Sequence, residues 1–177
     1  MVIETDRLIL RRWEDRDLAP YAALTADPQV MAWLGGVLDA DRSAAHVEAM
    51  EDHFEDFGYG RYVLERKADG AFLGYAGVAR IWPGLPVTGA EAGWRLARAH
   101  WGQGYATEAA RAAIGEALNR FGLPEVLAFT AETNLRSQAV MDRLALARDP
   151  VRDFDHPQLP PGDPLRRHIV YVARLPD

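Results

Sequence analysis

The run from Glu91 to Phe121 changes its hydrophobic period abruptly, and that change constrains the fold more than any other feature of the chain. Residues 91–96 alternate between two faces, which is the period of a β-strand. From Tyr105 onward the apolar residues recur at helical spacing, and the segment ends at Gly122. The stretch Trp101–Gly104, with two glycines, separates the two patterns. The run therefore predicts a strand, a tight glycine loop and a long helix.

A glycine loop that opens a helix is a potential anion site. Several backbone N–H groups lack partners there, and the helix dipole adds partial positive charge, so the place can bind phosphate. An ordinary strand-to-helix turn is the alternative, because a lone Gly-x-Gly is a weak signal. Two familiar phosphate motifs are excluded. No Gly-Lys-Ser/Thr ending occurs, and Thr107 stands where the dinucleotide fingerprint has its third glycine.

The composition narrows the class of protein. A chain of 177 residues suits a single domain, residues 1–177, which buries about 70% of the surface of its unfolded form. Because the chain has no cysteine, disulfides and thiolate chemistry are excluded. Because its histidines do not occur in HExxH spacing, no metal site is expected. The net charge of −6 argues against nucleic-acid binding. The first residues lack a signal-peptide layout and no apolar run is long enough to cross a membrane, so a cytoplasmic protein is expected.

The rest of the chain alternates strand and helix patterns, which predicts a mixed α/β sheet with helices packed on it. Two further segments, 82–87 and 153–164, are rich in proline and glycine and predict loops. Strands are predicted at 5–12, 59–65, 72–81, 91–96, 126–130, 147–152 and 168–173, and helices at 17–25, 27–34, 41–57, 105–121 and 134–144.

Polar residues that can cap helix N-termini mark three of these helices. Asp17, Asp41 and Asn134 are the predicted caps. The helix that begins near Asp41 is expected to end at Gly58 and to bury one apolar stripe. The stripe consists of Val47, Met50, Phe54 and Phe57.

Three short motifs occur in a fixed order along the chain. They are Thr5-Asp6-Arg7-Leu8, the nine residues from Trp101 to Ala109 (WGQGYATEA), and Asn134-Leu135-Arg136-Ser137. In these motifs the chain resembles the GNAT acetyltransferases, specifically the RimJ/RimL-type branch that acetylates ribosomal-protein N-termini. The resemblance implies an acetyl-CoA-dependent N-acetyltransferase. It also implies the GNAT fold, a twisted mixed sheet of about six to seven strands with a splay between two parallel strands.

The resemblance also implies where the cosubstrate binds. The splayed strand is expected at Gly93–Ala97 and its partner at Val126–Thr130, with the pantetheine arm pairing to the first as an added strand. The pyrophosphate is expected on the amides of about Ala99–Ala106. The expected cofactor-binding residues are Trp94, Leu96, Ala99, His100, Trp101, Gly102, Gln103, Gly104, Tyr105, Ala106, Asn134 and Ser137.

The sequence departs from the family pattern at three places. Ala99 stands where the family often has Gln or Arg, and Leu144-Ala145-Leu146 replaces the usual Leu-Gly-Phe. Many relatives carry a tyrosine acid in the helix after Asn134, but the nearest matching position is Met141. A tyrosine acid is therefore not expected.

Acetyl transfer to an amine needs a base for the ammonium, a donor to the thioester oxygen and a proton for the leaving thiolate. Glu91 is the expected base, directly or through water, and Ser137 the expected proton donor. Each has a structural alternative. Glu91 can pair with Arg95, four residues on and on the same face, and Ser137 can serve only the first turn of a helix that Asn134 caps.

The acceptor side is the least constrained part of the prediction. By position, Trp33, the Gly35-Gly36 turn and the loop 153–164 are expected to frame it. Asp153, Asp155 and His156 could recognise a cationic amine, or could lie on a solvated loop. The acceptor is a protein N-terminus or a small amine, and a homodimer is possible. The alternatives to an enzyme are a non-catalytic acyl-CoA sensor and a scaffold without ligand.

Overall fold

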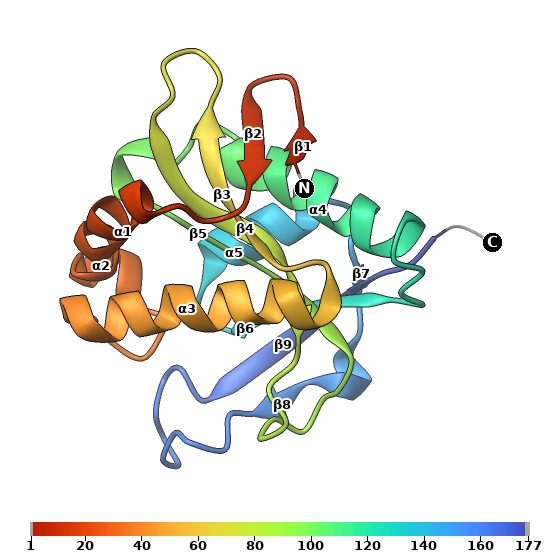
Figure 1. The fold of residues 1–177 in the computed structure, drawn as a ribbon. Helices are drawn as coiled ribbons and strands as arrows, with labels where there is room; N and C mark the ends of the chain where they lie inside the picture. Colours follow the sequence, from red (N-terminus) through yellow and green to blue (C-terminus); the bar gives the residue numbers. More distant parts are fainter. Residues whose placement is uncertain (1, 176–177) are drawn as a thin grey trace.

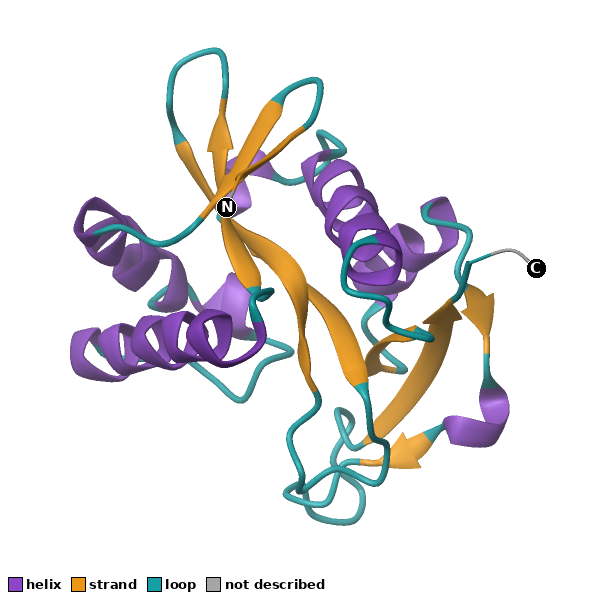
Figure 2. Ribbon diagram, turned by 45° about the vertical axis from the view of Figure 1, so that its right-hand side comes forward, coloured by secondary structure: helices purple, strands orange, loops and turns teal. Residues whose placement is uncertain are grey.

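The computed structural model describes residues 2–175, which form a mixed β-sheet with helices on both of its sides (Figures 1 and 2). The sheet has nine strands in the order β1-β2-β3-β4-β5-β6-β9-β7, and β8 pairs with β9. Among these strands the pair β5–β6 is parallel and the others are antiparallel. The predicted fold class is confirmed. The sheet has more strands than the six to seven expected, because the count includes β7 and β8, which are only two residues long.

The elements have the following bounds. The strands are β1 (Val2–Glu4), β2 (Leu8–Arg11), β3 (Arg61–Arg66), β4 (Phe72–Arg80), β5 (Ala90–Leu96), β6 (Val126–Ala131), β7 (Ala147–Arg148), β8 (Phe154–Asp155) and β9 (Arg167–Ala173). The helices are α1 (Leu18–Thr25), α2 (Pro28–Met31), α3 (Ala40–Phe57), α4 (Tyr105–Asn119) and α5 (Leu135–Arg143). Short 3-10 turns lie at Asp15–Asp17, Arg98–His100 and Pro150–Arg152.

The N-terminal segment is a hairpin, and the prediction of one strand over 5–12 was wrong. Strand β1 pairs with β2, with Val2 opposite Arg11. The turn between them closes on Thr5, whose backbone N–H donates to Leu8 O at 3.0 Å and whose hydroxyl accepts from Leu8 N at 3.1 Å. A threonine that binds the backbone three residues on favours a turn over an extended chain.

Two of the predicted helix caps were wrong, for different reasons. The N-cap of α3 is Asp39, whose carboxylate accepts from Arg42 N at 2.8 Å, so Asp41 lies inside the first turn. Asp17 occupies the N-cap position of α1 but makes no side-chain cap bond. It is buried, and its two oxygens accept from the Arg11 guanidinium at 2.7 and 2.8 Å. The ion pair uses the oxygens that a cap would need.

Other boundaries follow the predictions more closely. Asn134 caps α5, and Gly58 ends α3 in the left-handed conformation. Phe57 was wrongly placed in the buried stripe of α3: its side chain is 37% exposed and packs beside His53. The predicted strand 147–152 shortens to β7, because the 3-10 turn at Pro150 interrupts it.

Alternation along the strands gives the sheet two different faces. On one face, Val63 and Tyr75 pack with Trp13 and Tyr21 under α1 and α3. On the other face, Leu64, Ala76 and Leu96 pack with residues of α4. Figure 2 shows helices on both sides of the strands. From Tyr75 onward on β4, and along β5, side chains of odd number therefore point toward α1 and α3, and those of even number toward α4. Phe72 and Leu73 have the opposite orientation, because the pairing of β3 with β4 shifts register beside them.

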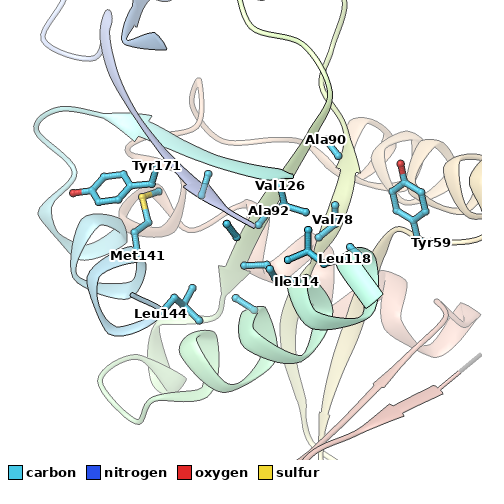
Figure 3. Close-up of a cluster of buried hydrophobic side chains, with 14 of the residues drawn as sticks. Tyr59, Val78, Ala90, Ala92, Ile114, Leu118, Val126, Met141, Leu144 and Tyr171 are labelled. Atoms are coloured by element: carbon cyan, nitrogen blue, oxygen red, sulfur yellow. The ribbon is translucent and has the colours of Figure 1, made fainter. Parts of the chain in front are cut away.

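A third cluster lies beneath α4 and α5 (Figure 3). Ala92 of β5 and Val126 of β6 meet Ile114 of α4 there, and Met141 of α5 is 2% exposed. Burying a side chain of this size contributes about 1.5–3 kcal/mol. Met141 thus belongs to the packing of α5 against the sheet. The cluster fixes both helices that border the gap between β5 and β6.

Candidate active site

Strands β5 and β6 separate after a single paired position. Strand β5 pairs with β4 along its whole length, but with β6 only at Glu91 opposite Leu127. Because Ala97 N donates to Leu73 O on β4, the backbone groups of Trp94 and Leu96 face the other way, into the gap. The predicted splay is present, and it leaves one edge of β5 available to an extended ligand.

A cleft of about 660 Å³ occupies this gap. The glycine loop and the start of α4 line it, together with the end of β5 and parts of α2 and α5. Ten of the twelve predicted cofactor-binding residues line it: Trp94, Leu96, His100, Trp101, Gly102, Gly104, Tyr105, Ala106, Asn134 and Ser137. Trp33, predicted on the acceptor side, also lines it. Ala99 and Gln103 do not line it; the exposed Gln103 side chain folds back along the loop and donates to Ala99 O at 3.0 Å.

The glycine loop presents unpaired backbone donors to the cleft. Gly102 and Gly104 have φ of +73° and +82°, and Gly104 is the N-cap of α4 with no side-chain cap bond. Within residues 2–175, the amides of residues 102–107 have no hydrogen-bond acceptor. A Cβ added at Gly102 would meet nothing within 4 Å, so the space beside the backbone is open. These donors, with the dipole of α4, fit a diphosphate.

Two motifs far apart in the sequence meet at the start of α4. The Glu108 carboxylate accepts from the Thr5 hydroxyl at 2.6 Å, from Arg7 N at 2.9 Å and from Arg7 Nε at 2.7 Å. Arg7 Nη1 also donates to Gln103 O at 2.9 Å, and its guanidinium lies 4.5 Å from the centre of the Tyr105 ring. The N-terminal hairpin thus holds the glycine loop in place. Neither motif predicted this contact.

The start of α5 forms the opposite wall. The Asn134 amide donates to Thr130 Oγ1 at 2.9 Å and to Ser137 Oγ at 3.1 Å, and its oxygen accepts from Ser137 N at 3.3 Å. Asn134 is therefore the cap of this helix, and both amide hydrogens are used inside the protein. Because Ser137 Oγ accepts from Asn134, its own hydrogen is free to be donated into the cleft.

Cationic residues that the sequence analysis missed also line the cleft. They are Arg95, Arg136 and Arg143. The Arg136 guanidinium lies 4.4 Å from the centre of the Trp101 ring, which holds it over the glycine loop. Arg136 directly precedes Ser137 in the third motif, and that position could have indicated that its side chain lines the cleft. Within residues 2–175 no aspartate or glutamate lines the cleft, so its walls favour negatively charged ligands.

Glu91 lies outside the set of residues that line the cleft, and its partner was wrongly predicted. Its carboxylate pairs with Arg61 of β3, not with Arg95. Arg61 reaches Glu91 by crossing Gly93, where a Cβ would lie 2.4 Å from Arg61 Nη1. The glycine at 93 therefore makes room for a guanidinium. Ser137 lines the cleft and Glu91 does not, and no contact joins them within residues 2–175.

A chain of hydrogen bonds continues from Arg95. Arg95 Nη1 donates to the Tyr21 hydroxyl at 3.1 Å, and that hydroxyl lies 2.6 Å from His46 Nδ1. Burial, and then the charges of Arg95 and Arg61, lower the pKa of His46 to about 4. Burial also raises the pKa of Tyr21. At neutral pH a phenol therefore donates to a neutral imidazole.

The model of the GNAT acetyltransferase domain matches residues 7–146 of this chain. The chain belongs to the GNAT acetyltransferase family. This acetyltransferase is 32% identical to the uncharacterized protein YkkB of Bacillus subtilis over 148 residues, 80% of this chain and 83% of YkkB. As a GNAT enzyme it is an acetyl-CoA-dependent N-acetyltransferase.

Solved structures confirm the fold of the acetyltransferase. An acetyltransferase from Agrobacterium tumefaciens superposes with a TM-score of 0.81 and 28% identity, covering 98% of this chain and 94% of its own. RimL, the ribosomal L7/L12 α-N-protein acetyltransferase, in complex with coenzyme A, gives a TM-score of 0.77 at 17% identity, with 98% of each chain covered. The predicted GNAT membership is confirmed, and its fold neighbours include RimL.

The loop 153–164 of the acetyltransferase does not line the cleft. The carboxylate of Asp153 accepts from the Arg148 guanidinium at 2.7 and 2.6 Å, and its side chain is only 8% exposed. Asp155 contacts Arg166 at 3.2 Å. Both carboxylates are thus paired within the protein. These contacts are those expected if the loop lies outside the site, and recognition of a cationic amine by the loop stays a prediction.

Two further observations concern the described part of the chain as a whole. In residues 2–175, no cluster of three or more His, Cys, Asp or Glu side chains is arranged to hold a metal ion. None of the helices described there has the length and hydropathy needed to cross a bilayer.

Proposed function

We propose that this acetyltransferase binds acetyl-CoA in the cleft and transfers the acetyl group to a primary amine by direct attack in a ternary complex. The observation that carries the proposal is the coincidence of three features in one cleft. They are the unpaired amides of residues 102–107, the free edge of β5 and the Ser137 hydroxyl. RimL, which shares the fold, has been solved in complex with coenzyme A.

Each part of the cosubstrate has a matching surface. The diphosphate would accept hydrogen bonds from the amides of residues 102–107, at the positive end of the α4 dipole. The pantetheine arm would pair with the backbone of Trp94 and with Leu96 N–H, because amide groups need partners and this edge has none from β6. The carbonyl oxygen of Leu96 already accepts from Trp101 Nε1 at 2.8 Å. Arg136 and Arg143 would add positive charge from the α5 wall of the cleft.

The chemistry requires one proton acceptor and one proton donor. The amine attacks the thioester carbon, a C–N bond forms, the C–S bond breaks, and the amine loses its proton. We assign the base to Glu91 acting through water, because its carboxylate shares a sheet face with Arg95 but does not itself line the cleft. A backbone N–H on the free edge of β5 would stabilise the carbonyl oxygen. Ser137 would donate its hydroxyl proton to the departing thiolate.

The decisive experiment measures product. The protein is incubated with acetyl-CoA and a panel of peptides and small amines. Release of free thiol is followed by absorbance, and acetylated products are identified by mass spectrometry. An acetylated amine whose formation depends on the protein would support the proposal. Tight binding of acetyl-CoA without product from any amine would instead favour a non-catalytic sensor, and failure of acetyl-CoA to raise the melting temperature would favour a scaffold without ligand.

A further inference from the structure

Arg95 carries a charge that no carboxylate compensates. Within residues 2–175 no Asp or Glu oxygen lies within 4.0 Å of its guanidinium, although most other arginines of the chain have such a partner. Its Nε–H is buried and makes no hydrogen bond, the one side-chain atom in that state among the described residues. An unpaired donor of a buried charged group is costly, so a partner from outside the protein, a ligand or an ordered water, is expected to complete it.

The neighbours of Arg95 do not supply the missing charge. Its Nη1 donates to Tyr21, and its guanidinium lies 5.4 Å from the centre of the Tyr75 ring. Glu91, the nearest carboxylate along the strand, is held by Arg61. This part of the sheet therefore holds two guanidinium groups and one carboxylate, and of the three only Arg95 lines the cleft. The electrostatic imbalance amounts to one positive charge facing the cleft.

The position of Arg95 separates it from the predicted diphosphate site. Arg95 points toward α1 and α3, with Tyr75, whereas its neighbours Trp94 and Leu96 point toward α4. The glycine loop and the N-terminus of α4 belong to the other face of the sheet. Arg95 is thus placed at the end of the cleft bordered by α1 and α2, where an acceptor would approach.

The free edge of the guanidinium has a defined shape. Because Nη1 donates to Tyr21, the Nε–H and Nη2 donors remain along one edge of the planar guanidinium. Two parallel N–H groups with this spacing match the two oxygens of a carboxylate, and such bidentate pairs are the strongest that arginine forms. A neutral hydroxyl or amide would satisfy one donor and leave the charge uncompensated.

We propose that Arg95 binds a carboxylate of the acceptor close to its reacting amine, so that the enzyme selects anionic amines. This proposal rests on the proposed acetyl transfer. The carboxylate belongs either to a free amino acid or to an acidic side chain of a peptide near its N-terminus. Polyamines and other polycations are poor acceptors, because the wall offers them no negative charge and one uncompensated positive charge.

The test compares matched acceptors on matched variants. The pairs are serine with serinamide, and the peptide amides Ser-Asp-NH2 with Ser-Asn-NH2, and spermidine is the cation. The wild-type protein should prefer the carboxylate member of one pair by about ten- to a hundredfold in kcat/KM. The pair that shows the preference identifies the source of the carboxylate.

The variant Arg95→Gln should abolish that preference mainly through KM, and Arg95→Lys should retain part of it, since lysine keeps the charge but not the fork. Acetyl-CoA affinity, measured by calorimetry, should change less than about twofold, because Arg95 lies on the other face of the sheet. The matched control is Arg80→Gln, which removes an exposed charge outside the cleft and should leave all the constants unchanged.

Several outcomes would overturn the proposal. Equal rates with both members of each pair, or a preference for spermidine, would show that the acceptor needs no carboxylate. Loss of acetyl-CoA binding in a folded Arg95→Lys protein would assign Arg95 to the cosubstrate instead. If the wild-type protein bound acetyl-CoA but formed no product from any amine, the proposed function would fail, and this proposal would fail with it. That outcome is distinguished from the others because the wild-type protein itself shows no activity.

A second readout does not depend on turnover. In a proton–nitrogen spectrum of the protein loaded with coenzyme A, the Arg95 Nε–H signal is assigned by its loss in Arg95→Lys. Adding serine, or Ser-Asp-NH2, should shift this signal downfield, and serinamide or Ser-Asn-NH2 should not. An unshifted signal with a carboxylate acceptor at saturation would contradict the proposed contact.

Discussion

Removing the Glu108 carboxylate should loosen the contact between the N-terminal hairpin and the glycine loop. In the variant Glu108→Ala, the Thr5 hydroxyl, the Arg7 N–H and two guanidinium nitrogens of Arg7 lose their common acceptor. The Glu108 side chain is 17% exposed, so water cannot fully replace it. The loss should appear in stability and, more weakly, in acetyl-CoA affinity, because Arg7 also holds Gln103 O.

The size of the expected destabilisation follows from how exposed each hydrogen-bond partner of Glu108 is. Because Arg7 is 47% exposed, its guanidinium can return to water, and that pair contributes only about 0.5–1 kcal/mol. The hydrogen bond from the Thr5 hydroxyl to a charged acceptor contributes about 1.5 kcal/mol, and the charge in the first turns of α4 about 0.3–1 kcal/mol. The expected destabilisation is about 2–3.5 kcal/mol, which for a chain of this length lowers Tm by about 4–14 °C.

The pH dependence of the effect has a definite sign. Partial burial on its own raises the pKa of Glu108, but hydrogen bonds from Thr5 and Arg7 and the Arg7 charge outweigh it and hold the pKa below its usual 4.5. A carboxyl group of this kind stabilises the fold above its unfolded pKa and stops doing so as the pH falls through the folded value. The difference between wild type and Glu108→Ala should be constant above pH 4.5 and shrink below it.

Thermal and urea unfolding followed by circular dichroism provide the measurement. Glu48→Ala is the matched control, since Glu48 is an exposed glutamate on α3 that makes no ion pair within residues 2–175, and it should change Tm by less than about 2 °C. If Glu108→Ala also changed Tm by less than about 2 °C, the hairpin contact would be unimportant and the reasoning from the hydrogen bonds would be refuted.

Four further substitutions test the site. Gly102→Val should weaken acetyl-CoA binding at least about tenfold by calorimetry, because its side chain strains a residue at φ +73° and fills the open space beside the loop; unchanged affinity would exclude the loop as the diphosphate site. Glu91→Gln should lower kcat about tenfold or more with unchanged acetyl-CoA affinity, and a full rate would place the base elsewhere. Ser137→Ala should lower kcat by about tenfold. An acetyl thioester of a more acidic thiol, whose thiolate leaves without a proton, should restore the rate only if the serine donates the proton. Gly93→Ala should lower the stability by about 1–3 kcal/mol in urea, because the new methyl group would lie 2.4 Å from Arg61 Nη1; an unchanged midpoint would mean that Arg61 moves freely.

The central run was predictable because its signals are local. The change from period two to helical spacing needs no knowledge of the rest of the chain, and β5, the glycine loop and α4 appear where the pattern placed them. The cap at Asn134 was predictable for the same reason, since its hydrogen bond reaches only to Ser137. Most of the expected cofactor-binding residues line the cleft because they belong to these segments.

The errors fall where a distant partner competes with a local preference. Asp17 has the sequence context of a helix cap, yet its carboxylate binds Arg11 of β2. The structural alternative considered for Glu91 was a pair with Arg95 on its own strand, but the sheet brings Arg61 to it instead. In each case the ion pair between elements satisfies the charge better than the local arrangement would. Such choices depend on strand order, which the sequence pattern does not reveal.

What the sequence determined on its own is the set of segments that carry the chemistry: a glycine loop at a helix start, a strand before it and a capped helix after it. These follow from residue spacing, because backbone donors and side-chain caps act over one or two turns. Only the tertiary structure decided how β5 and β6 separate, which guanidinium reaches Glu91, and that Arg95 has no carboxylate of its own. Those properties depend on which strands are neighbours and on what each side chain meets across the sheet, and electrostatic interactions respond to distance in space, whatever the separation along the chain.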